Sequence, residues 1–77
     1  LRIGGGTRLK ILEAMAIGLP VVSTSIGAEG LEANNNEQLL IADTPDEFVE
    51  KVISVMEDEE LEIRLGNEGR RFVEEKY

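Results

Sequence analysis

The fold of this chain is decided by residues 4–22, which read GGGTRLKILEAMAIGLPVV. Three consecutive glycines can adopt positive φ and let the backbone approach another group closely. They lead into a mostly apolar helical segment whose stop signal is Gly18, with Pro20 two residues further on. Residues 21–24 are rich in β-branched side chains and predict a short strand. A helix that returns to a strand after so short a link is the second half of a β-α-β unit, which implies parallel pairing.

The rest of the chain adds one more strand and two helices. Residues 39–42 form a second short apolar run, and Thr44, Pro45 and Glu47 have the spacing of a capping box with proline at the first helical position. We therefore expect an α/β fold, a partial Rossmann-like domain with parallel strands at about 21–24 and 39–42. Its helices should cover about residues 7–17, 45–57 and 59–76. Gly66 and Gly69 weaken the middle of the last helix, because glycine is unfavourable in a helix interior, and a break there is one interpretation. Residues 1–3 are too short to classify, the end of a strand being one interpretation.

The glycine loop and the first helix carry the candidate site. A glycine-rich loop that opens a helix suits a phosphate, because the first amide N–H groups are unpartnered and the helix dipole favours negative charge. Glu13 is the one acid of a helix that is apolar almost all round, a pattern typical of a buried helix. Two interpretations of Glu13 are open. It pairs with Lys10 at i,i+3 on a narrow exposed strip, which spacing alone favours, or its carboxylate faces a cleft and accepts hydrogen bonds from hydroxyls.

A second glycine-containing loop, residues 25–31, follows the strand at 21–24. Loops at the carboxyl ends of parallel strands line the ligand crevice of open α/β sheets. Gly27 and Gly30 would then let the backbone approach a ligand, although an ordinary flexible loop is the simpler interpretation.

Composition excludes several classes of chemistry. The 77 residues contain no cysteine and no histidine, which removes disulfides, thiolate nucleophiles, Cys/His zinc sites and Ser-His-Asp triads. The net charge is −8, and residues 37–77 hold all of the excess, with 13 acids against 5 bases. This balance argues against nucleic acid or an anionic membrane surface as a partner. No apolar run is long enough to span a membrane, so we expect a cytoplasmic location, or one peripheral to the inner membrane for a full-length protein.

The pattern from Arg2 to Thr24, with its core Leu-Glu-Ala-Met-Ala-x-Gly-x-Pro-Val-Val, resembles the C-terminal, nucleotide-sugar-binding domain of GT-B-fold, family-4-like (group 1) glycosyltransferases. The likeness continues through residues 27–31 and the two later helices, so it spans nearly the whole chain. It implies that residues 1–77 are a fragment of a donor-binding Rossmann-like domain. The implied enzyme is retaining, and it transfers a sugar from a nucleotide-diphosphate donor to an acceptor.

The resemblance also implies roles for individual residues. The residue that matches Glu13 hydrogen-bonds the ribose hydroxyls, and the backbone at the helix start faces the diphosphate and the sugar. The donor-binding residues expected on this basis are Gly5, Gly6, Thr7, Arg8, Leu9 and Glu13. We expect no catalytic residue, metal site or cofactor in the chain, the nucleotide sugar being a substrate. The expected partners are that donor and an N-terminal acceptor domain of the same protein.

One departure from the family pattern concerns Gly5, which stands where relatives carry the first of two glutamates. Sugar recognition must therefore differ from that in these relatives or rely on backbone groups, and the sequence does not identify the donor sugar. The chain alone should have no transferase activity, and its exposed sheet edges should lead to self-association. The competing interpretation is a non-enzymatic, acidic α/β protein-interaction module. A dinucleotide-binding dehydrogenase half fits less well, because the loop lacks G-x-G-x-x-G spacing.

Overall fold

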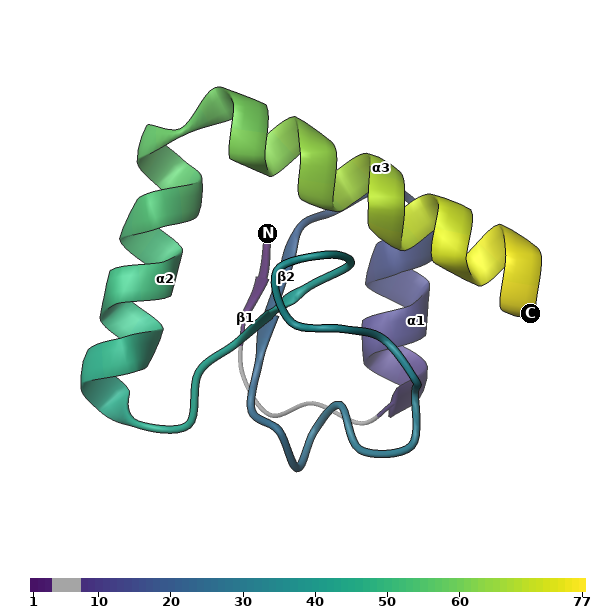
Figure 1. Ribbon diagram of the computed structural model, residues 1–77, viewed down its shortest axis with the longest axis horizontal. Coiled ribbons are helices and arrows are strands. Elements are labelled where there is room, and N and C mark those ends of the chain that lie inside the picture. Colours follow the sequence, from purple (N-terminus) through teal and green to yellow (C-terminus); the bar gives the residue numbers. More distant parts are fainter. Residues whose placement is uncertain (4–7) are drawn as a thin grey trace.

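The computed structural model describes residues 1–3 and 8–77. Its elements, labelled in Figure 1 where there is room, are in order β1 (Arg2–Ile3), α1 (Arg8–Ala16), β2 (Val21–Ser23), β3 (Leu40–Ile41), α2 (Pro45–Glu57) and α3 (Glu59–Lys76). The α/β class is as predicted. The ranges of the second and third helices match the prediction, and the expected start of the first helix at Thr7 lies outside the described residues.

The strands form one parallel sheet in the order β1-β2-β3. Arg2 is opposite Val21 in the β1–β2 pair, and Ser23 is opposite Ile41 in the β2–β3 pair. Residues 2–3 are thus a strand. Both predicted strands are shorter than expected, because the backbone enters a turn at Thr24, whose carbonyl accepts a hydrogen bond from Ala28 N–H at 3.1 Å. At the other strand, Leu39 forms an isolated bridge to Asn35 and lies outside β3.

The end of α1 is set by local chemistry. Gly18 has φ 79°, and its N–H donates to the carbonyl of Met15 at 3.0 Å. The N–H of Leu19 donates to the carbonyl of Ala14, also at 3.0 Å. These two bonds make a Schellman motif, in which glycine takes the left-handed position. The helix therefore ends at Ala16, one residue before the predicted limit, and Gly18 is its stop signal as expected.

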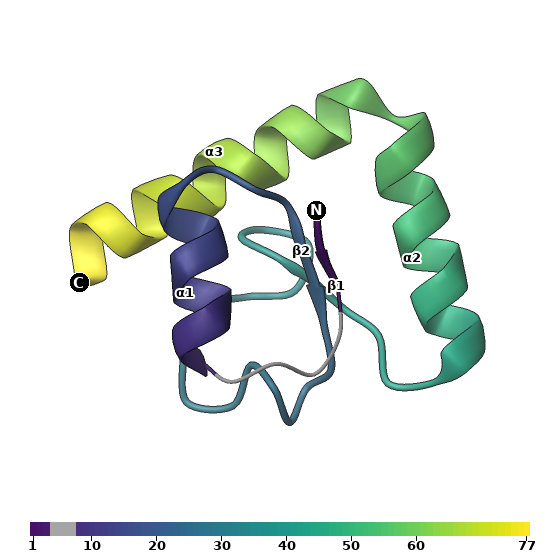
Figure 2. The same ribbon diagram turned by 180° about the vertical axis from the view of Figure 1, so that it is seen from behind.

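The core lies on both faces of the sheet. Successive strand residues point to opposite faces, and Val21 packs with α1 residues such as Ile11 and Met15, whereas Val22 packs with Val55 of α2. In Figures 1 and 2, α1 and α2 flank the strands, and α3 crosses above the strands from α2 to α1. α3 serves both clusters, with Leu65 on the α2 side and Phe72 on the α1 side.

Two helices are less covered than their composition predicts. On α1 only Ile11, Ala14 and Met15 are buried, whereas Leu9 and Ile17 are 64% and 73% exposed. The expectation that this helix is buried nearly all round is therefore wrong. On α2 the apolar arc is exposed at Val49, Ile53 and Met56. Three short strands cannot cover the whole apolar circumference of the helices packed on them.

α3 is continuous over its predicted range, so the interpretation of a break at Gly66 and Gly69 is wrong, and the two glycines have another purpose. A Cβ added at Gly66 would run into the carbonyl oxygen of Gly18, and one at Gly69 would lie 3.2 Å from Cγ of Met15. Both glycines are buried in a helix that continues from Glu59 to Lys76. They allow α3 to cross closely over the end of α1.

The capping box of α2 is confirmed. Thr44 Oγ1 accepts a hydrogen bond from Glu47 N–H at 3.1 Å, and Glu47 Oε1 accepts one from Thr44 N–H at 3.0 Å. This reciprocal pair satisfies donors at the helix start and sets the point where the chain leaves β3.

Candidate functional site

The carboxyl ends of the parallel strands gather three segments at one edge of the molecule. The start of α1, the loop that follows β2 and the link from β3 to α2 all lie at the lower edge in Figure 1. This is the edge at which open α/β sheets bind ligands. The sequence predicted the donor site here.

The loop after β2 is held by its own hydrogen bonds. Thr24 Oγ1 accepts a hydrogen bond from Gly27 N–H at 2.9 Å, and Glu29 N–H donates to the Ile26 carbonyl at 3.1 Å. Leu31, at the end of the loop, is buried in the core on the α1 side. The loop is therefore a series of bonded turns anchored at both ends.

A contact between two loops braces the same edge. The carboxylate of Asp43 accepts hydrogen bonds from Ser25 N–H at 2.8 Å and from Ser25 Oγ at 2.9 and 3.0 Å. Sequence reasoning missed this pair. A signal was present, because each residue stands two positions beyond the end of a strand, and the two strands are neighbours.

Arg8 lies against the loop after β2. Gly30 has φ 85°, and a Cβ added there would be 2.7 Å from Nη1 and 3.6 Å from Cζ of Arg8. The absence of a side chain at Gly30 leaves room for the Arg8 guanidinium, a contact that the sequence did not predict. Among residues 1–3 and 8–77, no carboxylate forms an ion pair with Arg8.

Glu13 is exposed on α1 and pairs with a neighbour. Its Oε2 is 3.7 Å from Nζ of Lys10, and the side chain is 56% exposed. This is the geometry of the ion-pair interpretation. Exposed pairs of this kind contribute only about 0–1 kcal/mol, so the pairing leaves the carboxylate available to a ligand that offers better hydrogen bonds.

Three of the six predicted donor-site residues have a described position. Arg8 and Glu13 are five residues apart and therefore about 140° apart around the helix, whereas Leu9 and Glu13, four apart, share a side. Gly5, Gly6 and Thr7 lie outside the described residues. The structure thus brings Arg8 to the loop after β2 and leaves Glu13 beside the exposed Leu9.

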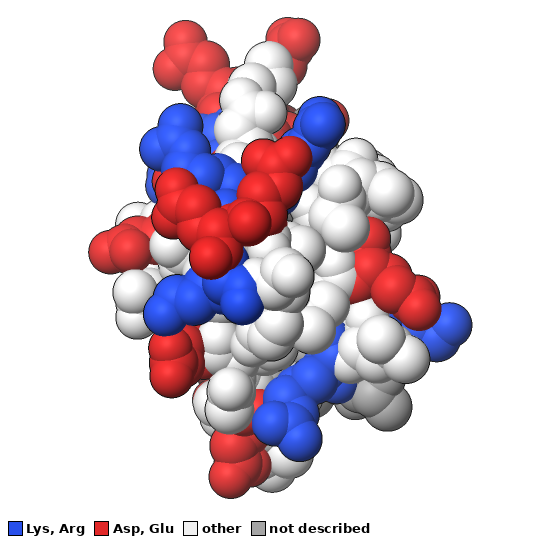
Figure 3. Space-filling view, turned by 90° about the vertical axis from the view of Figure 1, so that its right-hand side faces the viewer, with Lys and Arg blue, Asp and Glu red and all other residues white. Residues whose placement is uncertain are grey.

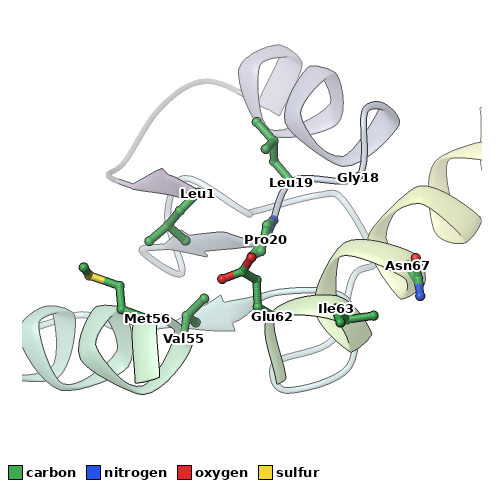
Figure 4. Close-up of a pocket in the computed structure, with 9 residues that line it drawn as sticks. All are labelled: Leu1, Gly18, Leu19, Pro20, Val55, Met56, Glu62, Ile63 and Asn67. Atoms are coloured by element: carbon green, nitrogen blue, oxygen red, sulfur yellow. The ribbon is translucent and has the colours of Figure 1, made fainter. Parts of the chain in front are cut away.

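A pocket of about 320 Å³ lies at the opposite edge. It is bounded by Leu1 before β1, Pro20 before β2, Val55 of α2 and Ile63 of α3, and Figure 4 shows the Glu62 carboxylate pointing into it. The amino ends of the strands border this pocket, so it is separate from the predicted donor site. Its lining is mixed, because Glu62 and Asn67 lie beside the apolar residues.

Charges on the α1 and α3 side are mixed. Figure 3 shows acidic and basic side chains interspersed on this face, and α3 carries the exposed pairs Arg70–Glu74 and Arg71–Glu68. The shortest ion pair between described residues joins Lys76 Nζ to Glu32 Oε2 at 2.8 Å.

The Lys76–Glu32 contact also shifts both ionisation equilibria. The hydrogen bond from Lys76, followed by its positive charge, holds the pKa of Glu32 below the ordinary value. The same bond and the Glu32 charge raise the pKa of Lys76.

The described part of the chain offers neither a metal site nor a membrane-spanning helix. No three acidic side chains of residues 1–3 and 8–77 are arranged to hold a metal ion. No helix among these residues has the length and apolar character needed to cross a membrane.

Comparison with known proteins gives two matches. The model of the family described as glycosyl transferases group 1 matches residues 1–58, which run from β1 to the end of α2. An uncharacterized 44.6 kDa protein in the cps region of Klebsiella pneumoniae is 36% identical over 74 residues. That match covers 96% of this chain, but the chain spans only 19% of the length of that relative. No solved structure matches the chain.

Proposed function

Because the chain belongs to the group 1 glycosyl transferases, we propose that it forms part of the donor site of an enzyme that transfers a sugar from a nucleotide diphosphate to an acceptor. One observation carries the proposal. The helix α1 starts at the carboxyl edge of a parallel sheet, directly after residues 4–7 of sequence GGGT, and it presents an exposed carboxylate at Glu13.

The proposed roles follow the chemistry of a nucleoside diphosphate. The diphosphate lies at the start of α1, where free backbone N–H groups and the helix dipole favour negative charge. The Glu13 carboxylate accepts hydrogen bonds from the ribose hydroxyls. The residues proposed for donor binding remain Gly5, Gly6, Thr7, Arg8, Leu9 and Glu13.

The rest of the enzyme is part of the same proposal. We assign the chain to the C-terminal donor-binding domain of a GT-B-fold, retaining transferase, with an N-terminal domain that binds the acceptor. The enzyme acts in carbohydrate biosynthesis and uses cytoplasmic nucleotide sugars, in the cytoplasm or at the inner membrane. Glycine at position 5 supplies no carboxylate, so recognition of the sugar differs from that in relatives or relies on backbone groups. The 77 residues alone have no transferase activity, and turnover of any nucleotide sugar by them would contradict this.

A titration with nucleoside diphosphates tests the site. Uridine, guanosine and adenosine diphosphates are titrated into the protein at its natural length by calorimetry. Glu13→Ala should lower the affinity for whichever diphosphate binds by roughly 10- to 100-fold, because hydrogen bonds to a charged group contribute about 1.5–3 kcal/mol.

The matched control is Glu74→Ala. Glu74 is also an exposed acid in a helical ion pair, with side-chain exposure of 64% against 56% for Glu13. It lies on α3, and its removal should leave the affinity unchanged. Equal affinities for the Glu13→Ala variant and the unaltered protein would remove Glu13 from the site.

A further inference from the structure

The contact between Arg8 and Gly30 joins two segments of the carboxyl edge. Arg8 is the first residue of α1, and Gly30 lies near the end of the loop after β2. The guanidinium occupies the space that a side chain at position 30 would fill, with Nη1 2.7 Å and Cζ 3.6 Å from the position of that Cβ. Gly30 therefore decides where the Arg8 guanidinium can lie.

Arg8 has no carboxylate partner among the described residues, although the net charge of the chain is −8. Lys10, Arg70, Arg71 and Lys76 form ion pairs with described residues, whereas Arg8 forms none, and neither do Lys51 and Arg64. An arginine left without a carboxylate partner in an acidic chain is available to an anion. Its planar guanidinium suits phosphate, which it can bind through two parallel charge-assisted hydrogen bonds.

The loop that carries Gly30 has little freedom to move away. Ser25 is held by the Asp43 carboxylate at 2.8 Å, and Leu31, directly after Gly30, is buried in the core. A side chain at position 30 would therefore displace the flexible end of Arg8 more readily than it would displace the loop backbone.

We infer that Arg8 binds the diphosphate of the donor and that Gly30 is a positioning residue, whose missing side chain keeps the Arg8 guanidinium at the carboxyl edge of the sheet. The inference rests on the proposed function, and it adds to that site a side chain that binds phosphate, Arg8, and a residue that positions it, Gly30.

The test uses calorimetric titration of the protein at its natural length with uridine, guanosine and adenosine diphosphates. Arg8→Ala should weaken binding about tenfold or more, because a charge-assisted contact is lost. Arg8→Lys should restore only part of this affinity, since an ammonium group lacks the planar fork. The affinity of the unaltered protein should also fall more steeply with added salt than that of Arg8→Ala.

Gly30→Ala needs a control for backbone strain, which Gly18→Ala provides. Gly18 has φ 79°, close to the 85° of Gly30, and a Cβ added there meets nothing within 4 Å. Both variants are strained, but Gly30→Ala alone displaces Arg8. Gly30→Ala should therefore lower the diphosphate affinity by roughly threefold or more beyond the effect of Gly18→Ala, because it moves the Arg8 guanidinium away from the phosphate. Gly30→Asn is the second variant, because asparagine tolerates positive φ and should keep the fold.

A double variant shows whether Gly30 acts through Arg8. In the Arg8→Ala background, Gly30→Ala should cause no further loss, because the displaced side chain is already absent. A full additional loss, or equal losses for Gly30→Ala and Gly18→Ala, would overturn the inference. The inference would also be overturned if the unaltered protein binds a diphosphate and Arg8→Ala binds it with the same affinity. If the unaltered protein binds none of the three diphosphates, the proposed function itself fails.

Discussion

The Asp43 carboxylate accepts hydrogen bonds from both the N–H and the hydroxyl of Ser25, at 2.8 to 3.0 Å. The two residues are 18 apart in sequence, the same offset as between the paired residues Ser23 and Ile41. The contact therefore extends the register of β2 and β3 two residues beyond the sheet. It ties the loop that carries Gly30 to the start of α2.

Removing the carboxylate should loosen this loop. We expect Asp43→Ala to lower the free energy of unfolding by about 1 kcal/mol, a value typical of exposed hydrogen bonds. It should also speed amide hydrogen exchange at Ser25, which loses its acceptor. Urea denaturation and exchange measured by NMR check both, with Glu50→Ala on the outer side of α2 as the control. Unchanged protection at Ser25 would contradict the proposed brace.

The crossing of α3 over α1 gives a second prediction. Alanine normally stabilises a helix interior by about 1 kcal/mol relative to glycine, but Gly66→Ala should destabilise the protein by about 2 kcal/mol, because its Cβ meets a backbone oxygen that cannot turn away. Gly69→Ala should cost less than Gly66→Ala, since its nearest neighbour is a side-chain atom, Cγ of Met15 at 3.2 Å, which can shift more readily than backbone. Thermal denaturation ranks the two variants, and a stabilised Gly66→Ala would show that the helices are not in close contact.

The Glu32–Lys76 pair predicts a dependence of stability on pH. The pKa of Glu32 is lowered on folding, so its stabilising contribution is present above pH 4.5 and is lost as the pH falls through the folded-state pKa below that value. The pKa of Lys76 is raised, so its contribution is present below pH 10.5 and is lost as the pH rises through a higher folded-state pKa.

Glu32→Gln should therefore be slightly less stable than the unaltered protein between these limits. The difference should shrink outside them, most clearly in acid. Both side chains are exposed, so the effect is small and should weaken further in salt. Denaturation curves at several pH values, with Glu50→Gln as the control, measure it, and a difference that grows in acid would be the opposite of the expected sign.

Self-association of the 77-residue chain is a further prediction. β1 is an edge strand with Ile3 exposed, and α2 exposes Ile53 and Met56. Unpaired strand edges and exposed apolar side chains favour contact with a second copy. Sedimentation velocity should show species larger than a monomer, and the double variant Ile53→Lys, Met56→Lys should reduce them. Ile26→Lys, in the loop after β2, is the control, and a strictly monomeric chain would contradict the prediction.

Features set by neighbours in sequence were predictable. The capping box of Thr44 and Glu47, and the helix stop at Gly18, depend on residues a few positions apart, and both appear as expected. The parallel strands followed from the short link between α1 and β2. The exact ends of the strands were not predictable. The turn at Thr24 depends on a hydrogen bond that its carbonyl accepts from the N–H of Ala28, four residues ahead.

Features set by contacts between distant segments were not predictable from local patterns. Gly66 and Gly69 suggested a break in a helix, and only the crossing with α1 shows why they are glycines. Gly30 suggested close approach to a ligand, whereas its space is filled by Arg8. The exposure of Leu9 and Glu13 depends on how much of α1 the narrow sheet and α3 cover.

The most direct test of the central claim compares a nucleoside diphosphate with its 2′,3′-dideoxy analogue, in the protein at its natural length and in Glu13→Ala. If Glu13 binds the ribose hydroxyls, the unaltered protein should prefer the ribonucleotide by roughly 10- to 100-fold, and Glu13→Ala should bind the two ligands about equally. An unaltered protein that binds both equally well, or a Glu13→Ala variant that keeps the full preference, would contradict the claim.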